Sequence, residues 1–337
     1  MTEPVVFETV TVTGKREVDV PEGSLYLRKA TLLLVQGTQA LDLSEMHFTF
    51  ATVQEDEESP SNCAIRVFNL SPKTEDTIRN EYSRVVINAG YEKAAFGLIF
   101  DGTIIQFRKG RLNATTTYLD ILTNDGDVAY NFAMVARNAA AGVTRKERLD
   151  IAISAMNSKG VTAGELMVDA AGGILPRGKV LFGLARGVIR SEVQTIGATW
   201  TIQNGKVNVI PLDGYLPTEA VVLTADTGLI GRAEQTSDGI RVKCLLNPKI
   251  IIGGLVKIDN ASINQTIQKD GMGPPGGGAM LAYNQYAGLQ QYASIAADGL
   301  YRVYVAEHVG DNRGQDWYTN LVCLTVNPVT NKVKPYG

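Results

Sequence analysis

The sequence predicts a β-rich α+β fold in which two β domains flank a mixed middle region of helices and a β-hairpin. Short alternating or apolar runs, separated by turn residues, fill residues 24–123 and return from residue 226. Between them, residues 124–225 contain Ala-rich and helically spaced segments. The length of 337 residues suits two to three domains of ordinary size.

The first β domain is preceded by an arm. Residues 1–23 carry Thr/Val alternation and an acidic stretch, and we expect them to be extended. Residues 54–62 are rich in acidic side chains and predict a solvated loop. The first β domain, residues 24–123, should form a small barrel or sandwich, with strands expected over 24–35, 45–53, 64–69, 84–89, 96–100, 103–107 and 115–122.

Two local signals stand out in this domain. Ser71 can cap a short helix whose first position is Pro72. Asp101-Gly102, between two apolar runs, predicts a tight β-hairpin turn.

The middle region, residues 124–225, predicts helices over 127–141 and 179–196. A further helix begins at Thr144, because Thr144 and Glu147 have the spacing of a capping box. Asn204-Gly205 is the strongest hairpin signal in the chain, and it should pair residues 198–203 with 206–210.

The last region, residues 226–337, predicts a second β domain. It is interrupted by an insertion at 271–297, whose Gly/Pro-rich part, 271–278, excludes regular structure and whose remainder favours a helix over an ordered loop. Strands are expected over 239–246, 250–258, 299–309 and 317–326. The order of elements resembles that of the first β domain, but residue identity is negligible, so duplication and chance similarity both stay open.

Cysteine and histidine are too scarce for most catalytic and metal sites. Cys63, Cys244 and Cys323 form no CxxC pair, and an odd, scattered set suits a reducing compartment rather than a disulfide framework. His47 should lie on the polar face of a half-buried strand. His-dependent catalysis therefore depends on His308.

His308 lies in the richest polar cluster of the chain, residues 307–318. His308 with Asp311 or Asp316 could form a general base with an orienting carboxylate, or part of a metal site. The turn residues of this cluster favour a hairpin loop instead. An enzyme or carbohydrate-binding module that uses the loop around His308 and Trp317 is kept as the alternative function.

The charge balance argues against a protein that binds the phosphate backbone of nucleic acids. Lys+Arg number 32 and Asp+Glu 35, a net charge of -3. The short basic groups, Arg108, Lys109 and Arg111, and Arg145, Lys146 and Arg148, suit an exposed face or a salt bridge between subunits. No apolar run reaches the roughly 18 residues of a membrane span, and residues 1–22 lack a signal-peptide core. The low charge, 20%, together with 34 glycines, suggests a component of an assembly.

The order of elements and several short phrases resemble the baseplate hub proteins of contractile-tailed bacteriophages, whose fold also occurs at the head of type VI secretion spikes. The resemblance covers most of the chain and is carried by residues 64–71, 89–91, 98–104, 182–196, 200–210, 239–242, 245–248, 301–303, 308–311 and 317–319.

This resemblance implies two tube-like β-barrel domains flanking the middle region. It implies a homotrimer that forms a pseudo-sixfold ring, joins the hexameric tail tube to the trimeric central spike, and lets DNA pass as cargo. Other baseplate and tape-measure proteins would be partners, and the protein would be assembled in the host cytoplasm into the virion tail. It implies no enzymatic activity and no catalytic, cofactor-binding or metal-binding residues. The arm and the 271–297 insertion depart from the family pattern.

Overall fold

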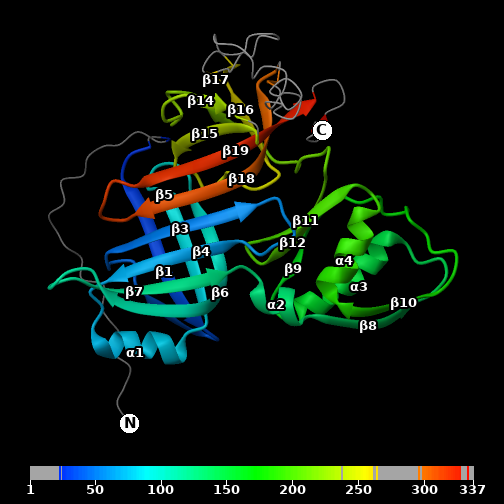
Figure 1. Ribbon diagram of the computed structural model, residues 1–337, viewed down its shortest axis with the longest axis horizontal. Helices are drawn as coiled ribbons and strands as arrows, with labels where there is room; N and C mark the ends of the chain where they lie inside the picture. The colour runs from blue at the N-terminus through cyan, green and yellow to red at the C-terminus, as the bar shows by residue number, and fades with distance from the viewer. Residues whose placement is uncertain are drawn as a thin grey trace, which may run out of the picture.

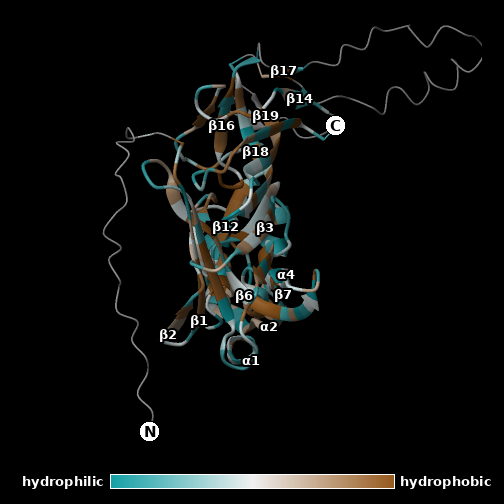
Figure 2. Ribbon diagram, turned by 90° about the vertical axis from the view of Figure 1, so that its left-hand side faces the viewer, coloured by the Kyte–Doolittle hydropathy of each residue, from teal (hydrophilic) through white to brown (hydrophobic). Residues whose placement is uncertain are grey.

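The computed structural model describes residues 23, 25–236, 238–260, 263–264, 295–296, 298–327 and 332–333. The N- and C-terminal β regions stack on one another, and the middle region projects from one side of this stack (Figure 1). A view from the side shows the same stacking, with apolar residues along many of the strands (Figure 2). The expected arm and the 271–297 insertion lie outside the described residues, except for Gly23 and residues 295–296.

The N-terminal β region packs seven strands and one helix around a core that includes Leu32, Phe48 and Ile121. Ser71 caps the helix by accepting from the Thr74 backbone N–H at 3.1 Å, and Pro72 is its first residue, as predicted. The elements are β1 (Arg28–Gln36), β2 (Gln39–Asp42), β3 (Phe48–Glu55), β4 (Asn62–Phe68), α1 (Pro72–Glu81), β5 (Arg84–Tyr91), β6 (Phe96–Arg111) and β7 (Thr117–Asn124).

The middle region has its own apolar core, in which Trp200 and Met156 are buried. The structure confirms the capping box of Thr144 and Glu147 and the Asn204-Gly205 hairpin, whose two turn residues have φ of 52° and 72°. The elements are α2 (Asp127–Phe132), β8 (Met134–Ala139), α3 (Arg145–Asn157), β9 (Thr162–Leu166), β10 (Lys179–Leu184), α4 (Ala185–Gln194), β11 (Ala198–Gln203) and β12 (Lys206–Pro211).

The C-terminal β region surrounds a third core, which includes Ile240, Val256 and Cys323. Its strands are β13 (Val221–Leu223), β14 (Ala233–Gln235), β15 (Ile240–Leu245), β16 (Leu255–Ile258), β17 (Ile263–Asn264), β18 (Leu300–Asp311), β19 (Trp317–Asn327) and β20 (Lys332–Val333). The chain is thus β-rich, and its principal sheet runs through both β regions in the order β17-β14-β15-β19-β18-β3-β4-β7-β6-β5-β1-β2.

The predicted turn at Asp101-Gly102 is wrong, because β6 runs without interruption through both residues. Asp101 instead accepts a hydrogen bond from Arg84 Nε on the neighbouring strand at 2.6 Å. A Cβ atom on Gly102 would lie 2.6 Å from the Phe100 ring and 2.7 Å from the Asn124 carbonyl oxygen. Gly102 therefore permits close packing within a strand rather than a turn.

Two predicted helices are partly wrong. In the segment 127–141, the helix ends at Phe132 and the strand β8 follows it. In the segment 179–196, residues Lys179–Leu184 form the strand β10, and only Ala185–Gln194 are helical. β8 and β10 pair with each other over their whole lengths, so a non-local contact decides the structure of both segments. The strand expected over 250–258 begins only at Leu255.

Candidate assembly interface

The two β regions are joined by a strand ladder between β3 and β18. Residues Thr49–Glu55 of β3 pair antiparallel with Val305–Asp311 of β18. The other half of β18 pairs with β16, so β18 belongs to both regions. This ladder makes one continuous sheet from two segments that are some 250 residues apart in the sequence.

One face of this sheet, which we call the open face, can be traced through the strand registers. Residues directly opposite one another in paired strands lie on the same face. One row across the sheet is Leu245, Tyr318, Val309, Ala51, Ala64, Leu122 and Gln106. The charged residues on this face include the basic Arg66, Arg108, Arg241 and Lys243 and the acidic Glu55, Asp120, Glu307 and Asp311.

Several of these charges are paired within the chain. Arg66 donates to Asp120 through Nε at 2.6 Å and Nη2 at 3.0 Å, and its guanidinium lies 4.1 Å from the centre of the Tyr118 ring. Lys243 Nζ lies 3.6 Å from the centre of the Tyr318 ring. Balanced and internally paired charges make a surface that attracts a polyanion weakly.

A buried ion pair connects the middle region to this sheet. Arg302 Nη2 on β18 donates to Asp56, which directly follows β3, and both side chains are almost fully buried. Thr199 of β11 donates to Asp56 at 2.9 Å. Arg302 Nη1 also donates to backbone carbonyls at the end of β12, those of Pro211 at 2.9 Å and Gly214 at 2.8 Å.

The ion pair corrects part of the expectation that residues 54–62 are a solvated acidic loop: a loop does separate β3 from β4 and Glu57 is exposed, but Asp56 is buried. Burial raises the pKa of Asp56 despite the charge of Arg302, and burial lowers the pKa of Arg302 despite Asp56. The signal that could have located the partner was Arg302, a lone basic residue in an apolar strand.

Asp125 forms a second contact at the base of the middle region. It directly follows β7, is 2% exposed, and accepts a hydrogen bond from the Gly205 backbone N–H at 2.9 Å. Burial raises the pKa of Asp125 to about 7, although this hydrogen bond opposes the shift. Asp125 therefore ties the tip of the Asn204-Gly205 hairpin to the N-terminal β region.

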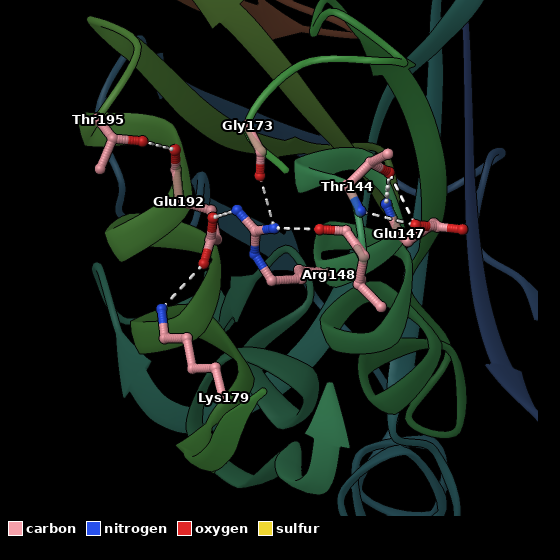
Figure 3. A network of polar contacts seen from close by, with 8 residues as sticks. Thr144, Glu147, Arg148, Gly173, Lys179, Glu192 and Thr195 are labelled. Carbon is pink, nitrogen blue, oxygen red and sulfur yellow. Dashed lines mark hydrogen bonds and ion pairs between the residues drawn. The ribbon is translucent and has the colours of Figure 1, made fainter. Parts of the chain in front are cut away.

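Inside the middle region, a polar network links α3, α4 and β10 (Figure 3). Arg148 Nη2 donates to Glu192 at 2.6 Å, and Arg148 Nη1 donates to the Gly173 carbonyl at 2.9 Å. Lys179 Nζ donates to the other oxygen of Glu192 at 3.2 Å. Burial raises the pKa of Glu192, but the hydrogen bonds from Arg148 and Lys179 outweigh burial and hold it below its usual value. Arg148, expected on an exposed or intersubunit face, is thus an internal residue.

An apolar surface covers the outside of the β8 and β10 pair, which we call the β8–β10 outer face. Met134, Val180 and Phe182 point to this side and are 60%, 69% and 74% exposed. Phe132, at the end of α2, is 66% exposed. The sequence reading missed this face because it assigned both strands to helices.

The structure separates the residues of the predicted polar cluster. His308 lies within β18 and is 2% exposed, and its Nδ1 hydrogen-bonds to the Thr319 hydroxyl at 2.9 Å. Burial lowers the pKa of His308 to about 4. Trp317 is also 2% exposed and belongs to the core of the N-terminal β region. Both side chains are therefore buried within strands, and neither is exposed in the loop that the alternative function would use.

Asp311 pairs with the other histidine. His47 Nε2 lies 3.0 Å from Asp311 Oδ1, and the His47 ring stacks on Phe68 with the ring centres 4.4 Å apart. Asp311 also accepts from the backbone N–H groups of Arg313 and Gly314, as turn aspartates do. The predicted hairpin is confirmed, and β18 ends two residues later than expected.

The three cysteines are free and buried. Burial raises the pKa of the Cys244 thiol to about 12, which makes this sulfur a poor nucleophile. No group of three or more His, Cys, Asp or Glu side chains suited to a metal ion occurs among the described residues. Within the same part of the chain, no helix has the length and apolar character needed to span a membrane.

Comparisons with known proteins place the fold. No protein-family model and no curated protein sequence matches the chain. Among solved structures, the 43 kDa tail protein of prophage MuSo2 from Shewanella oneidensis aligns with a TM-score of 0.54 at 7% identity, over 88% of this chain and 98% of the tail protein. A tail protein from Neisseria meningitidis MC58 aligns with a TM-score of 0.51 at 9% identity, over 88% of this chain and 96% of that protein.

A component of the type VI secretion system from E. coli aligns with a TM-score of 0.49 at 8% identity, over 82% of this chain and 73% of that one. The two alignments above 0.5 span nearly the whole of the matched proteins, so the likeness extends over most of this chain. The chain therefore has the fold of these two phage tail proteins.

Proposed function

We propose that this chain is the structural baseplate hub of a contractile phage tail. In this role it forms a homotrimer that joins the hexameric tail tube to the trimeric central spike, and it has no catalytic activity. The proposed units are the arm, 1–23, two tube-like barrel domains, 24–123 and 226–337, and the middle region, 124–225.

The observation that carries this proposal is the β3–β18 ladder, which fuses two β regions of one chain into a single sheet. Three chains with two such regions each would supply six β units around one axis. A ring of that kind can present six similar units to a hexameric tube and retain threefold symmetry for a trimeric spike. The likeness to phage tail proteins supports this reading.

The open face supports a lumen through which DNA passes as cargo. Basic and acidic side chains both lie on this face, and Arg66, Asp120 and Lys243 have partners within the chain. A strongly basic wall would hold the phosphate backbone, whereas a balanced wall lets it slide.

The exposed apolar side chains of the β8–β10 outer face suit a surface that another tail component covers. Tube, spike, other baseplate and tape-measure proteins are the proposed partners. The proposed location is the virion tail, after assembly in the host cytoplasm.

Light scattering coupled to size-exclusion chromatography tests the proposal. We expect the mass of a trimer, either for the protein alone or after addition of tube and spike proteins. A mass that stays at the monomer value in the presence of both partners would refute the hub role.

A further inference from the structure

A groove runs along the outer edge of β10, between this strand and α4, and we call it the β10 groove. α4 follows β10 directly and returns antiparallel to it, because the ion pair of Lys179 and Glu192, at 3.2 Å, joins the start of the strand to the end of the helix (Figure 3). The groove has a volume of about 250 Å³. It is lined by the whole of β10 and, on α4, by Gly187, Val188, Ser191 and Glu192.

The outer edge of β10 has backbone donors without a strand partner. Among the described residues, β10 and β8 form a sheet of two strands. The Ala185 N–H donates to the Ala133 carbonyl at 2.8 Å, on the β8 side. Because alternate residues of an antiparallel strand bond to opposite sides, the N–H groups of Val180, Phe182 and Leu184 point away from β8. An edge of this kind is a template for another strand.

Two glycines keep the β10 groove open. Gly187 lies inside α4, where glycine is unfavourable, yet a Cβ atom there would have no atom of the described residues within 4 Å. Gly183 in β10 has the same open space around it, and its φ of 126° favours glycine. A glycine that no neighbour in the chain requires is typical of a place where another backbone approaches closely.

The β10 groove suits an extended segment with short apolar side chains. An added strand satisfies the free backbone groups of the edge, while its alternate side chains contact the walls. The acidic lining residue, Glu192, is bound by Arg148 and Lys179 and has no charge left for a ligand. The apolar lining residues are Val180, Leu181, Phe182, Leu184 and Val188.

The N-terminal arm contains a segment with this chemistry. Residues 5–13 are Val, Thr or Phe at every position except Glu8, and these residue types favour strands. In an extended chain, Val10 and Val12 lie on one side and Thr9 and Thr11 on the other. Both sides therefore offer short side chains to the groove.

Charge favours the same segment. Residues 1–14 carry the acidic side chains of Glu3 and Glu8 and no basic side chain. Arg137 on β8 and Arg177, two residues before β10, are exposed, and neither strand contains an acidic residue. Opposite charges thus approach one another when this part of the arm lies along β10.

We propose that residues 5–13 of a second copy of this chain lie in the β10 groove as a third strand beside β10. This inference rests on the proposed homotrimer, because the strand comes from another chain. Residues 14–22 connect the segment to Gly23, whose N–H donates to the Lys93 carbonyl at 2.7 Å. These connecting residues extend over at most about 32 Å. The start of β1 and α4 lie on opposite sides of the N-terminal β region (Figures 1 and 2), so the arm is too short to run around that region to the groove of its own chain.

Hydrogen exchange in the complete protein tests the added strand. In the wild-type oligomer, we expect the backbone amides of residues 180–184 to exchange at least about tenfold more slowly than in the variant V10P/T11P. The two prolines remove one N–H from each side of the arm segment and prevent its pairing. The control E17P/V18P places two adjacent prolines outside the segment, and it should keep the slow exchange of the wild type.

A change in the groove itself should release the arm in the same way. Gly187→Phe fills the β10 groove from α4, and the open space around Gly187 allows the far-UV circular dichroism to stay that of the wild type. The control Gln194→Phe adds a ring at the exposed last residue of α4, outside the groove, and should exchange as the wild type does. If G187F is misfolded, the comparison of V10P/T11P with the wild type still decides the question.

Co-expression of the two defective chains tests whether the arm comes from a second copy. V10P/T11P retains an intact groove, and G187F retains an intact arm. In mixed oligomers, residues 180–184 of the V10P/T11P chain should recover slow exchange, because the neighbouring G187F chain supplies the strand. Slow exchange in the wild type without recovery in the mixed oligomers would assign each arm to its own chain and overturn the inference.

A wild-type oligomer in which residues 180–184 exchange as fast as in V10P/T11P would overturn the added strand and leave the proposed hub role intact. Slow exchange that arises only with tube or spike proteins, and that persists in V10P/T11P, would also overturn it, because another protein then occupies the groove. A wild-type chain that stays monomeric with both partners present would overturn the hub role and this inference together.

Discussion

Two buried titratable groups, Asp125 and His308, should affect stability in opposite directions over the same pH range. Burial raises the pKa of Asp125 from 3.8 to about 7, so its neutral form is favoured in the folded chain. The free energy of unfolding should therefore fall as pH rises from about 4 to 7. With about 1.4 kcal/mol for each unit of pKa, this contribution is about 4 kcal/mol.

His308 acts in the other direction. Burial lowers the pKa of His308 from 6.5 to about 4, so the unfolded chain takes up a proton first as the pH falls. The contribution of His308 to the free energy of unfolding is about 3 kcal/mol. It is fully present above pH 6.5 and is lost as the pH falls to 4. The two effects nearly cancel in the wild type between pH 4 and 7.

The substitution Asp125→Asn removes the contribution of Asp125 to this pH dependence. It retains a side-chain oxygen that can accept the hydrogen bond from the Gly205 N–H. Denaturant unfolding at several pH values measures the free energy of unfolding of both proteins. Between pH 4 and 7, this free energy should rise in the variant by about 4 kcal/mol relative to the wild type. Asp150→Asn, on an exposed position of α3, is the control and should follow the wild type. If the free energies of unfolding of D125N and the wild type differ by an amount that stays constant within about 1 kcal/mol across this pH range, the reasoning is refuted.

Three further changes test the packing of the fold. Arg302→Met should lower the free energy of unfolding by about 3–5 kcal/mol, because it leaves Asp56 buried without its counter-charge. The double variant D56L/R302M should lose clearly less stability than the two single variants added together, and additive losses would contradict the coupling. Thr144→Ala should lower stability by about 1 kcal/mol through loss of the capping box, and an unchanged unfolding midpoint would contradict that role. Gly102→Ala should cost about 1–3 kcal/mol, since its Cβ would lie 2.6 Å from the Phe100 ring; a variant as stable as the wild type would show that β6 can shift at no cost.

Sequence reasoning succeeded where a signal is local. The cap at Ser71, the capping box at Thr144 and Glu147, and the Asn204-Gly205 hairpin each depend on residues within a few positions of one another. It failed at Asp101-Gly102, because the same dipeptide suits a turn and a crowded strand, and the choice depends on Phe100 and Asn124 beside it. It also failed at β8 and β10, which are strands because each pairs with the other.

The polar residues show the same limit. The acidic run around Asp56 looks solvated in sequence, since Arg302 lies 246 positions away. His308 was grouped with Asp311 because they are near in sequence, but alternation along β18 places His308 in the interior and Asp311 beside His47. The match between the β6–β7 and β18–β19 hairpins is invisible in residue identity because it lies in strand register, bulge position and one cation–π contact.

Imaging the purified oligomer by electron microscopy tests the central claim most directly. The account predicts class averages of a ring with threefold symmetry and six similar units around a central channel. Rings of another symmetry, twofold dimers, or single chains alone in the presence of tube and spike proteins would contradict it.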